Sequence, residues 1–191
     1  MSDRRSAIRP RRMDRRFAGH GPFRKVPEPP DPGYRTRKSP EETDMPSTIR
    51  LHRVLATRPD KVYRAFIEAD ALAKWLPPNG FTCTVHSFDG KVGGAFRMSF
   101  RNFTTGEGHS FGGEYIELVP GERVRYTDRF DDPNLPGEMQ VTVTLKKVSV
   151  GTEINIEQAG VPDLIPAEAC YLGWQESLKN LARLVEPEIN Q

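Results

Sequence analysis

The chain has 191 residues, of which 36% are hydrophobic and 28% are charged, and this composition fits one globular domain. No apolar run approaches the roughly 18 residues that a membrane helix needs, so composition argues against a membrane-spanning protein. Residues 1–46 hold 12 of the 28 basic residues and 7 of the 26 acidic residues. The net charge is therefore +5 in this segment and −3 in the rest of the chain. A mildly acidic folded part argues against nucleic-acid binding, because that function needs a basic surface.

Residues 1–46 contain eight of the 17 prolines, an arginine-rich start and no apolar periodicity. Such a segment buries too little apolar surface to offset its ordering entropy, so we expect a disordered basic tail. Three interpretations stay open: an arm for an anionic partner, a transit peptide, and an extension upstream of a start at Met45. We expect one domain over residues 47–186 and a short tail over 187–191.

The two cysteines, Cys83 and Cys170, are far apart and belong to neither a CxxC pair nor a Cys/His cluster. We therefore expect no metal site and no cofactor, and two free thiols in apolar surroundings, although a disulfide stays open. No secretory hydrophobic region follows the basic N-terminus, which predicts a cytoplasmic protein.

The first folded elements are a strand and two short helices. Residues 48–57 alternate and are rich in β-branched side chains, which predicts a strand. Pro59 is well placed to open a helix whose apolar residues recur at helical spacing. Residues 69–76 predict a second short helix, which the prolines at 77 and 78 end.

From residue 81 to residue 160 the hydrophobic period is two, and turn signals recur about every dozen residues. This pattern predicts six hairpin-linked strands, or seven with the first one, in a strongly curved antiparallel sheet. Residues 163–185 predict a long amphipathic helix that covers this sheet. The expected class is therefore α+β, with the sheet wrapped around the C-terminal helix. The apolar face of that helix holds Cys170, Tyr171, Trp174, Leu178, Leu181 and Val185.

Three stretches, KWLPPNGF within 74–100, FGGEYIELVPGERVRY within 111–137 and YLGWQESLKNLARLVE at 171–186, resemble the helix-grip fold of the START-like (SRPBCC) superfamily. This superfamily includes polyketide cyclases and pollen-allergen-like proteins. The closer resemblance is to its bacterial branch, which is similar to the C-terminal domain of the activator of the Hsp90 ATPase. The resemblance implies a cavity between the concave sheet and the long helix.

Strand alternation indicates which side chains face that cavity. Three arginines of residues 123–130 lie on one face of the predicted strand, and this face must be exposed to solvent. Asp128 lies on the opposite face and therefore points inward, beside aromatic residues. This is an unusual place for a carboxylate, because burying an unpaired charge is costly. The candidate ligand-binding residues are Trp75, Phe96, Met98, Phe100, His109, Phe111, Tyr115, Tyr126, Asp128, Phe130, Met139, Tyr171 and Trp174.

Each candidate has a structural alternative. An aromatic and methionine stripe that faces a helix is equally typical of a packed core. Asp128 is either a ligand anchor, a general base or a residue displaced to the rim, and His109 is either a solvated histidine or a contact for the polar end of a ligand. Trp75 either closes the cavity or pins the short helix.

The sequence contains no G-x-S-x-G, Walker, dinucleotide-binding or HExxH motif. The first functional hypothesis is a module that binds a hydrophobic or aromatic small molecule in the cavity. A cyclase- or hydrolase-like enzyme that uses the same cavity and a chaperone co-factor that binds proteins are the alternatives, so catalysis stays open. The expected partner is a hydrophobic small molecule, with no nucleic acid and no membrane, and a homodimer stays open.

Overall fold

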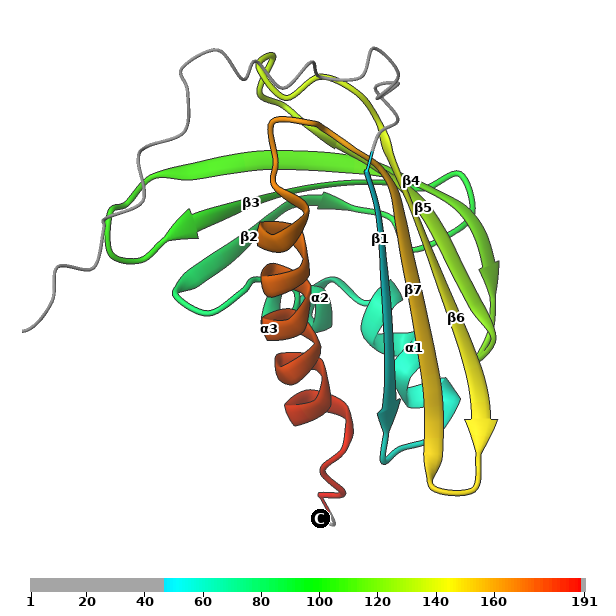
Figure 1. Ribbon diagram of the computed structural model, residues 1–191. Helices are drawn as coiled ribbons and strands as arrows, with labels where there is room; N and C mark the ends of the chain where they lie inside the picture. The colour runs from blue at the N-terminus through cyan, green and yellow to red at the C-terminus, as the bar shows by residue number, and fades with distance from the viewer. Residues whose placement is uncertain (1–46, 190–191) are drawn as a thin grey trace, which may run out of the picture. The chain divides into compact units, whose positions relative to one another are not determined.

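The computed structural model describes residues 47–189, which form seven strands and three helices (Figure 1). The expectations for residues 1–46 lie outside the described residues. In chain order the elements are β1 (Ser47–Leu55), α1 (Pro59–Ile67), α2 (Ala69–Trp75), β2 (Phe81–Phe88), β3 (Ala95–Asn102), β4 (Gly108–Val119), β5 (Arg123–Phe130), β6 (Met139–Val148), β7 (Gly151–Val161) and α3 (Ala167–Val185).

All seven strands belong to one antiparallel sheet with the order β1-β7-β6-β5-β4-β3-β2. The six strands β2 to β7 are joined in sequence by hairpin connections. Strand β1 forms one edge of the sheet, beside β7. The sheet curves around α3 (Figure 1), which confirms the expected α+β class. None of the helices within residues 47–189 combines the length and apolar character that crossing a bilayer requires.

Two local features of β4 produce part of this curvature. The pairing of β4 with β5 is irregular between Tyr115 and Glu117, and such bulges bend a strand. At Gly113 the two strands approach so closely that a Cβ atom would overlap the carbonyl oxygen of Thr127. A glycine is therefore required at this position of the concave face.

Helix α1 begins with a proline in its first turn and buries Val62 and Phe66. The carbonyl groups of the last turn of a helix lack partners within the helix, and here two aromatic side chains supply them. The Trp75 Nε1 group donates to the Ala65 oxygen at 2.8 Å, and the Tyr115 hydroxyl donates to the Phe66 oxygen at 2.6 Å. These bonds fix α1 to α2 and to β4.

Helix α3 begins at Ala167, later than the expected residue 163. Pro166 explains the difference, because a proline lacks the amide hydrogen of a helical turn and disfavours a helical conformation at the preceding Ile165. The end at Val185 is as expected. Leu178, Leu181 and Val185 are buried, so the C-terminal half of the helix contributes to the core.

The core extends to the contacts of α1 with β5, β6 and β7 and of α3 with β1, and α2 packs against α1, α3 and β2. Leu55, Val143, Ile154 and Leu181 are almost completely inaccessible there. The N-terminal half of α3 is less tightly packed, and Trp174 is only half-buried. The fold therefore leaves its free internal space at the end of α3 that faces β3, β4 and β5.

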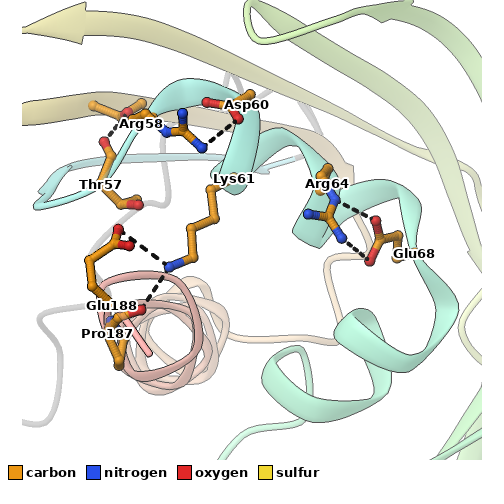
Figure 2. Close-up of polar contacts among 9 residues, drawn as sticks. Thr57, Arg58, Asp60, Lys61, Arg64, Glu68, Pro187 and Glu188 are labelled. Atoms are coloured by element: carbon orange, nitrogen blue, oxygen red, sulfur yellow. Dashed lines mark hydrogen bonds and ion pairs between the residues drawn. The ribbon is translucent and has the colours of Figure 1, made fainter. Parts of the chain in front are cut away.

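Polar contacts hold the segment after α3 against α1 (Figure 2). The Lys61 Nζ group donates to the Pro187 oxygen at 2.7 Å and lies 3.7 Å from the Glu188 carboxylate. The Ala56 amide donates to the Glu186 carboxylate at 3.1 Å. Exposed contacts of this kind contribute little free energy individually, and they attach the residues that follow α3 to α1 and to Ala56.

Candidate functional site: an aromatic cavity between α3 and the sheet

A cavity of about 410 Å³ lies between the concave face of the sheet and the N-terminal half of α3. The sheet side is formed by Phe96, Met98, Phe100, His109, Phe111, Tyr115, Tyr126, Asp128, Phe130 and Gln158. The helical and loop side is formed by Phe66, Leu72, Leu76, Pro78, Leu135, Ile165, Ala169, Cys170, Gly173, Trp174 and Ser177. Its size falls within the roughly 300–1,000 Å³ that is usual for small-molecule sites.

Ten of the thirteen residues that the sequence nominated line this cavity. They alternate along three adjacent strands, as expected for one face of a sheet, and Trp174 faces them from the helix. A role of these residues in ligand binding stays a prediction. The ten are Phe96, Met98, Phe100, His109, Phe111, Tyr115, Tyr126, Asp128, Phe130 and Trp174.

The other three nominated residues are not among those that line the cavity, and their role in ligand binding stays a prediction. Trp75 is fully buried beside Phe66, where its indole binds the end of α1 and pins the short helix. Met139 is buried and pairs with Asp128 across β5 and β6, and its sulfur accepts a hydrogen bond from Gln158 at 3.2 Å. Tyr171 is 38% exposed, and its hydroxyl accepts a bond from the Arg50 amide of β1 at 3.3 Å.

Gln158 is the polar lining residue that sequence reasoning missed. Its Oε1 atom accepts a hydrogen bond from the Trp174 indole at 2.7 Å, so it joins β7 to α3 across one end of the cavity. The signal was present in the sequence, because alternation along residues 151–161 places Gln158 on the same face as Ile154 and Ile156. On α3 the apolar face predicted from the sequence includes Cys170 and Trp174, whereas the lining residues of α1, α2 and the loops carry no comparable signal, since tertiary packing alone brings them to this face.

Asp128 lies on the inward face of β5, between Tyr126 and Phe130. Its Oδ1 atom is buried and has no hydrogen-bond partner, a condition that it shares, among the described residues, with the Thr57 hydroxyl outside the cavity. Burial raises the pKa of Asp128 from 3.8 to about 7, and the Arg129 amide opposes this shift in part. At neutral pH this carboxyl group can therefore accept or release a proton.

The two lining tyrosines differ in how their hydroxyl groups are used. The Tyr115 hydroxyl is bound to Phe66, whereas Tyr126 lies two positions from Asp128 on the same face. Burial raises the pKa of Tyr126 well above its usual value, and the nearby Asp128 adds to the shift. Tyr126 thus remains protonated at neutral pH. The ring of Tyr126 packs 5.8 Å from Phe96 and 5.9 Å from Tyr115.

His109 lies at the start of β4 and is exposed as a whole, although its ring packs among aromatic side chains. The ring centroid is 5.7 Å from those of both Phe100 and Phe130. Desolvation lowers the pKa of His109, so the imidazole is neutral at neutral pH. Its position fits the edge of the cavity better than a fully solvated loop.

Charge is distributed unequally between the two faces of the sheet. The lining residues include no lysine or arginine, and Asp128 is the one acidic side chain among them. The arginines of β3 and β5 point outward as expected, where Arg97 binds Asp131 at 2.6 Å and Arg123 binds Glu117 at 3.1 Å. Within residues 47–189 no cluster of three or more histidine, cysteine or acidic residues could hold a metal ion.

Residues 56–186 match the family of activator of Hsp90 ATPase homolog 1-like proteins. The chain belongs to this family. Protein CV1439 from Chromobacterium violaceum is 62% identical, the match covers 74% of this chain and 98% of that chain, and the TM-score is 0.73. No curated protein matches the chain.

Two more distant structures share the fold of this Hsp90 ATPase activator homolog 1-like chain. A protein from Rhodobacter sphaeroides is 23% identical with a TM-score of 0.64, over 72% of this chain and 90% of that one. Protein NE0264 from Nitrosomonas europaea is 23% identical with a TM-score of 0.60, over 72% of this chain and 92% of that one. The START-like helix-grip fold inferred from the sequence is thereby confirmed.

Proposed function

We propose that this chain is a small-molecule-binding module and that its ligand is a hydrophobic or aromatic compound held between α3 and the sheet. The observation that carries the proposal is the cavity of about 410 Å³, whose wall is mostly aromatic and aliphatic. A largely apolar wall with a few polar groups is the usual composition of a small-molecule site. A packed core of the same residues would have filled this space, because protein interiors seldom contain large voids.

The test is binding of N-phenylnaphthylamine, a neutral probe whose fluorescence increases in apolar surroundings. Gly173 on α3 lines the cavity, and a Cβ atom built there meets no other atom within 4 Å. Gly173→Phe should therefore direct an aromatic ring into the cavity and occupy part of its volume. The matched control is Leu172→Phe, which adds an aromatic ring at the neighbouring position, where the side chain is 67% exposed and outside the cavity.

We expect saturable probe binding to the wild type and to Leu172→Phe, and a loss of at least about tenfold in affinity for Gly173→Phe. Retained binding by Gly173→Phe would place the probe elsewhere and contradict the proposal. Absence of binding to the wild type would contradict it as well. Far-ultraviolet circular dichroism of all three proteins checks that the helix is intact.

Asp128 favours one alternative, an enzyme that uses the same cavity. A carboxyl group with a pKa of about 7 is suited to accept a proton from a bound compound or to return one. Under this alternative, Asp128→Asn abolishes turnover of a compound that the cavity binds and leaves its affinity largely unchanged. A binding module instead shows no chemical change of the bound compound, which mass spectrometry of the released ligand can determine.

A further inference from the structure

We propose that the cavity selects hydrophobic compounds that carry a protonated amine, that Asp128 binds the ammonium group, and that hydrophobic carboxylates are excluded. This inference rests on the proposed function, because it presupposes that a ligand enters the cavity. It adds the charge and the hydrogen-bonding group of that ligand.

The unpaired oxygen of Asp128 is the first step. Buried side-chain oxygens in native proteins nearly always have a hydrogen-bond partner, so an exception needs an explanation. Two hydroxyl groups of the wall do have protein partners: the Tyr115 hydroxyl donates to the Phe66 oxygen and the Ser177 hydroxyl donates to the Leu76 oxygen, both at 2.6 Å. Asp128 Oδ1 therefore has a free acceptor position, and because Asp128 lines the cavity, a rotation of its carboxylate would present this oxygen to a donor on a ligand.

The charge of the wall is the second step. Among residues 47–189 neither lysine nor arginine lines the cavity, so no basic side chain of this part compensates the carboxylate of Asp128 or attracts a second anion. A carboxylate ligand would meet like charge in a poorly solvated space, which is unfavourable, whereas an ammonium group would form a charge-assisted hydrogen bond. The net charge of the cavity therefore favours a cation.

Aromatic rings beside Asp128 are the third step. Tyr126 and Phe130 flank it on the inward face of β5, and side chains two positions apart on a strand lie about 7 Å from each other. The faces of such rings attract cations, most strongly where water is excluded. A carboxylate between aromatic rings thus offers an ammonium group both a hydrogen bond and favourable surroundings, while the hydrocarbon part of the ligand contacts the remaining wall.

Binding of an amine must then depend on pH, since the ionised carboxylate is required. The other titratable groups of the wall are His109 and Tyr115 on β4, Tyr126 on β5 and Cys170 on α3, while the lining residues of β3 are not titratable. Burial favours the neutral form of all four. With a pKa of about 7, the ionised fraction of Asp128 rises from about 3% at pH 5.5 to about 90% at pH 8. The affinity for an amine should rise by up to roughly 30-fold over this range.

The test uses three compounds with the same ring system: naphthylmethylamine, naphthylmethanol and naphthoate. The affinity of each compound is measured by displacement of N-phenylnaphthylamine from the wild type, from Asp128→Asn and from Asp131→Asn. Asp131→Asn is the control, because the exposed Asp131 pairs with Arg97 outside the cavity. We expect the wild type at pH 8 to bind the amine most tightly and naphthoate least. Asp128→Asn should lose at least about tenfold in amine affinity, while the alcohol changes by less than about threefold and Asp131→Asn behaves as the wild type.

The outcomes separate this inference from the proposed function. If the probe and all three compounds fail to bind, the proposed function itself fails. If the alcohol binds but the amine is not preferred, or Asp128→Asn binds the amine as the wild type does, only the inference is refuted. Binding of naphthylmethanol by Asp128→Asn shows that the cavity of this variant is intact, so a loss of amine affinity is then due to the missing carboxylate. Should that variant not fold, the wild-type pH profiles decide: a rising affinity for the amine beside a flat one for the alcohol supports the inference, and parallel profiles refute it.

Discussion

Replacing Asp128 by asparagine should change how the free energy of unfolding depends on pH. The folded protein binds the Asp128 proton more tightly than the unfolded chain, because burial raises the pKa from 3.8 to about 7. Between these two values the folded state carries more protons, so its stability falls as the pH rises. The stabilisation that the neutral carboxyl group provides is complete below pH 3.8 and is lost by about pH 8.

The size of the effect follows from the shift. One pKa unit corresponds to about 1.4 kcal/mol, so Asp128 should reduce the stability of the wild type by about 3 kcal/mol between pH 4.5 and pH 8. Water in the cavity reduces this value, because Asp128 borders a space that solvent can enter. Asparagine does not titrate, so Asp128→Asn should be equal to or less stable than the wild type near pH 4.5 and more stable near pH 8.

Urea unfolding at several pH values, followed by circular dichroism, measures this difference directly. The relevant quantity is the free energy of unfolding of Asp128→Asn minus that of the wild type, which cancels the contributions of all other titrating groups. Asp131→Asn is the control, since its exposed ion pair with Arg97 is solvated and should give a nearly constant difference. Parallel pH dependence of Asp128→Asn and the wild type would refute the claim that burial raises the pKa of this carboxyl group.

Three further substitutions test the packing around the cavity by urea unfolding at pH 7. Gly113→Ala should destabilise the protein by at least about 2 kcal/mol, because the added Cβ overlaps a backbone oxygen of β5, and an unchanged stability would contradict the close approach of the strands. Gly173→Ala should stabilise α3 by about 0.5–1 kcal/mol, because the site has room for a methyl group; a loss of stability would mean that it does not. Tyr115→Phe should cost about 1–3 kcal/mol, because the buried Phe66 oxygen loses its donor, and a neutral effect would show that this bond does not hold α1 to β4.

The fold was predictable because its signals are local. Alternation and turn residues mark every strand between residues 81 and 160, and Pro59 marks the start of α1. The helical pattern predicts a start of α3 at residue 163, whereas the helix begins at Ala167, because Pro166 lacks the amide hydrogen that a helical turn needs at this position. One proline therefore decides where the helix begins.

The cavity wall was predictable only where one strand determines its own faces. Alternation placed Phe96, Met98 and Asp128 on the concave side, and the structure agrees. The positions of Trp75 and Tyr171 could not be derived in this way, because their hydrogen bonds reach Ala65 and Arg50, and pairings of this kind exist only after the chain has folded. Gln158 obeys alternation and was overlooked because its polar side chain resembled a surface residue.

Asp128 conflicts with the rule that guided its own placement, since the same alternation that puts apolar residues inward puts a carboxylate among them. Sequences that fold reliably agree with such rules at most positions, and departures concentrate where function requires them. In a fully packed core the Oδ1 atom of this side chain would have no access to a further donor, and removal of the charge would stabilise the protein at neutral pH. In a cavity of about 410 Å³, the same side chain can be reached by a ligand. Gly113, on the neighbouring strand, adds no side chain to that face. The unfavourable burial of Asp128 and the unfilled space beside α3 are thus explained together by a ligand that supplies a hydrogen-bond donor, and neither is explained by packing alone.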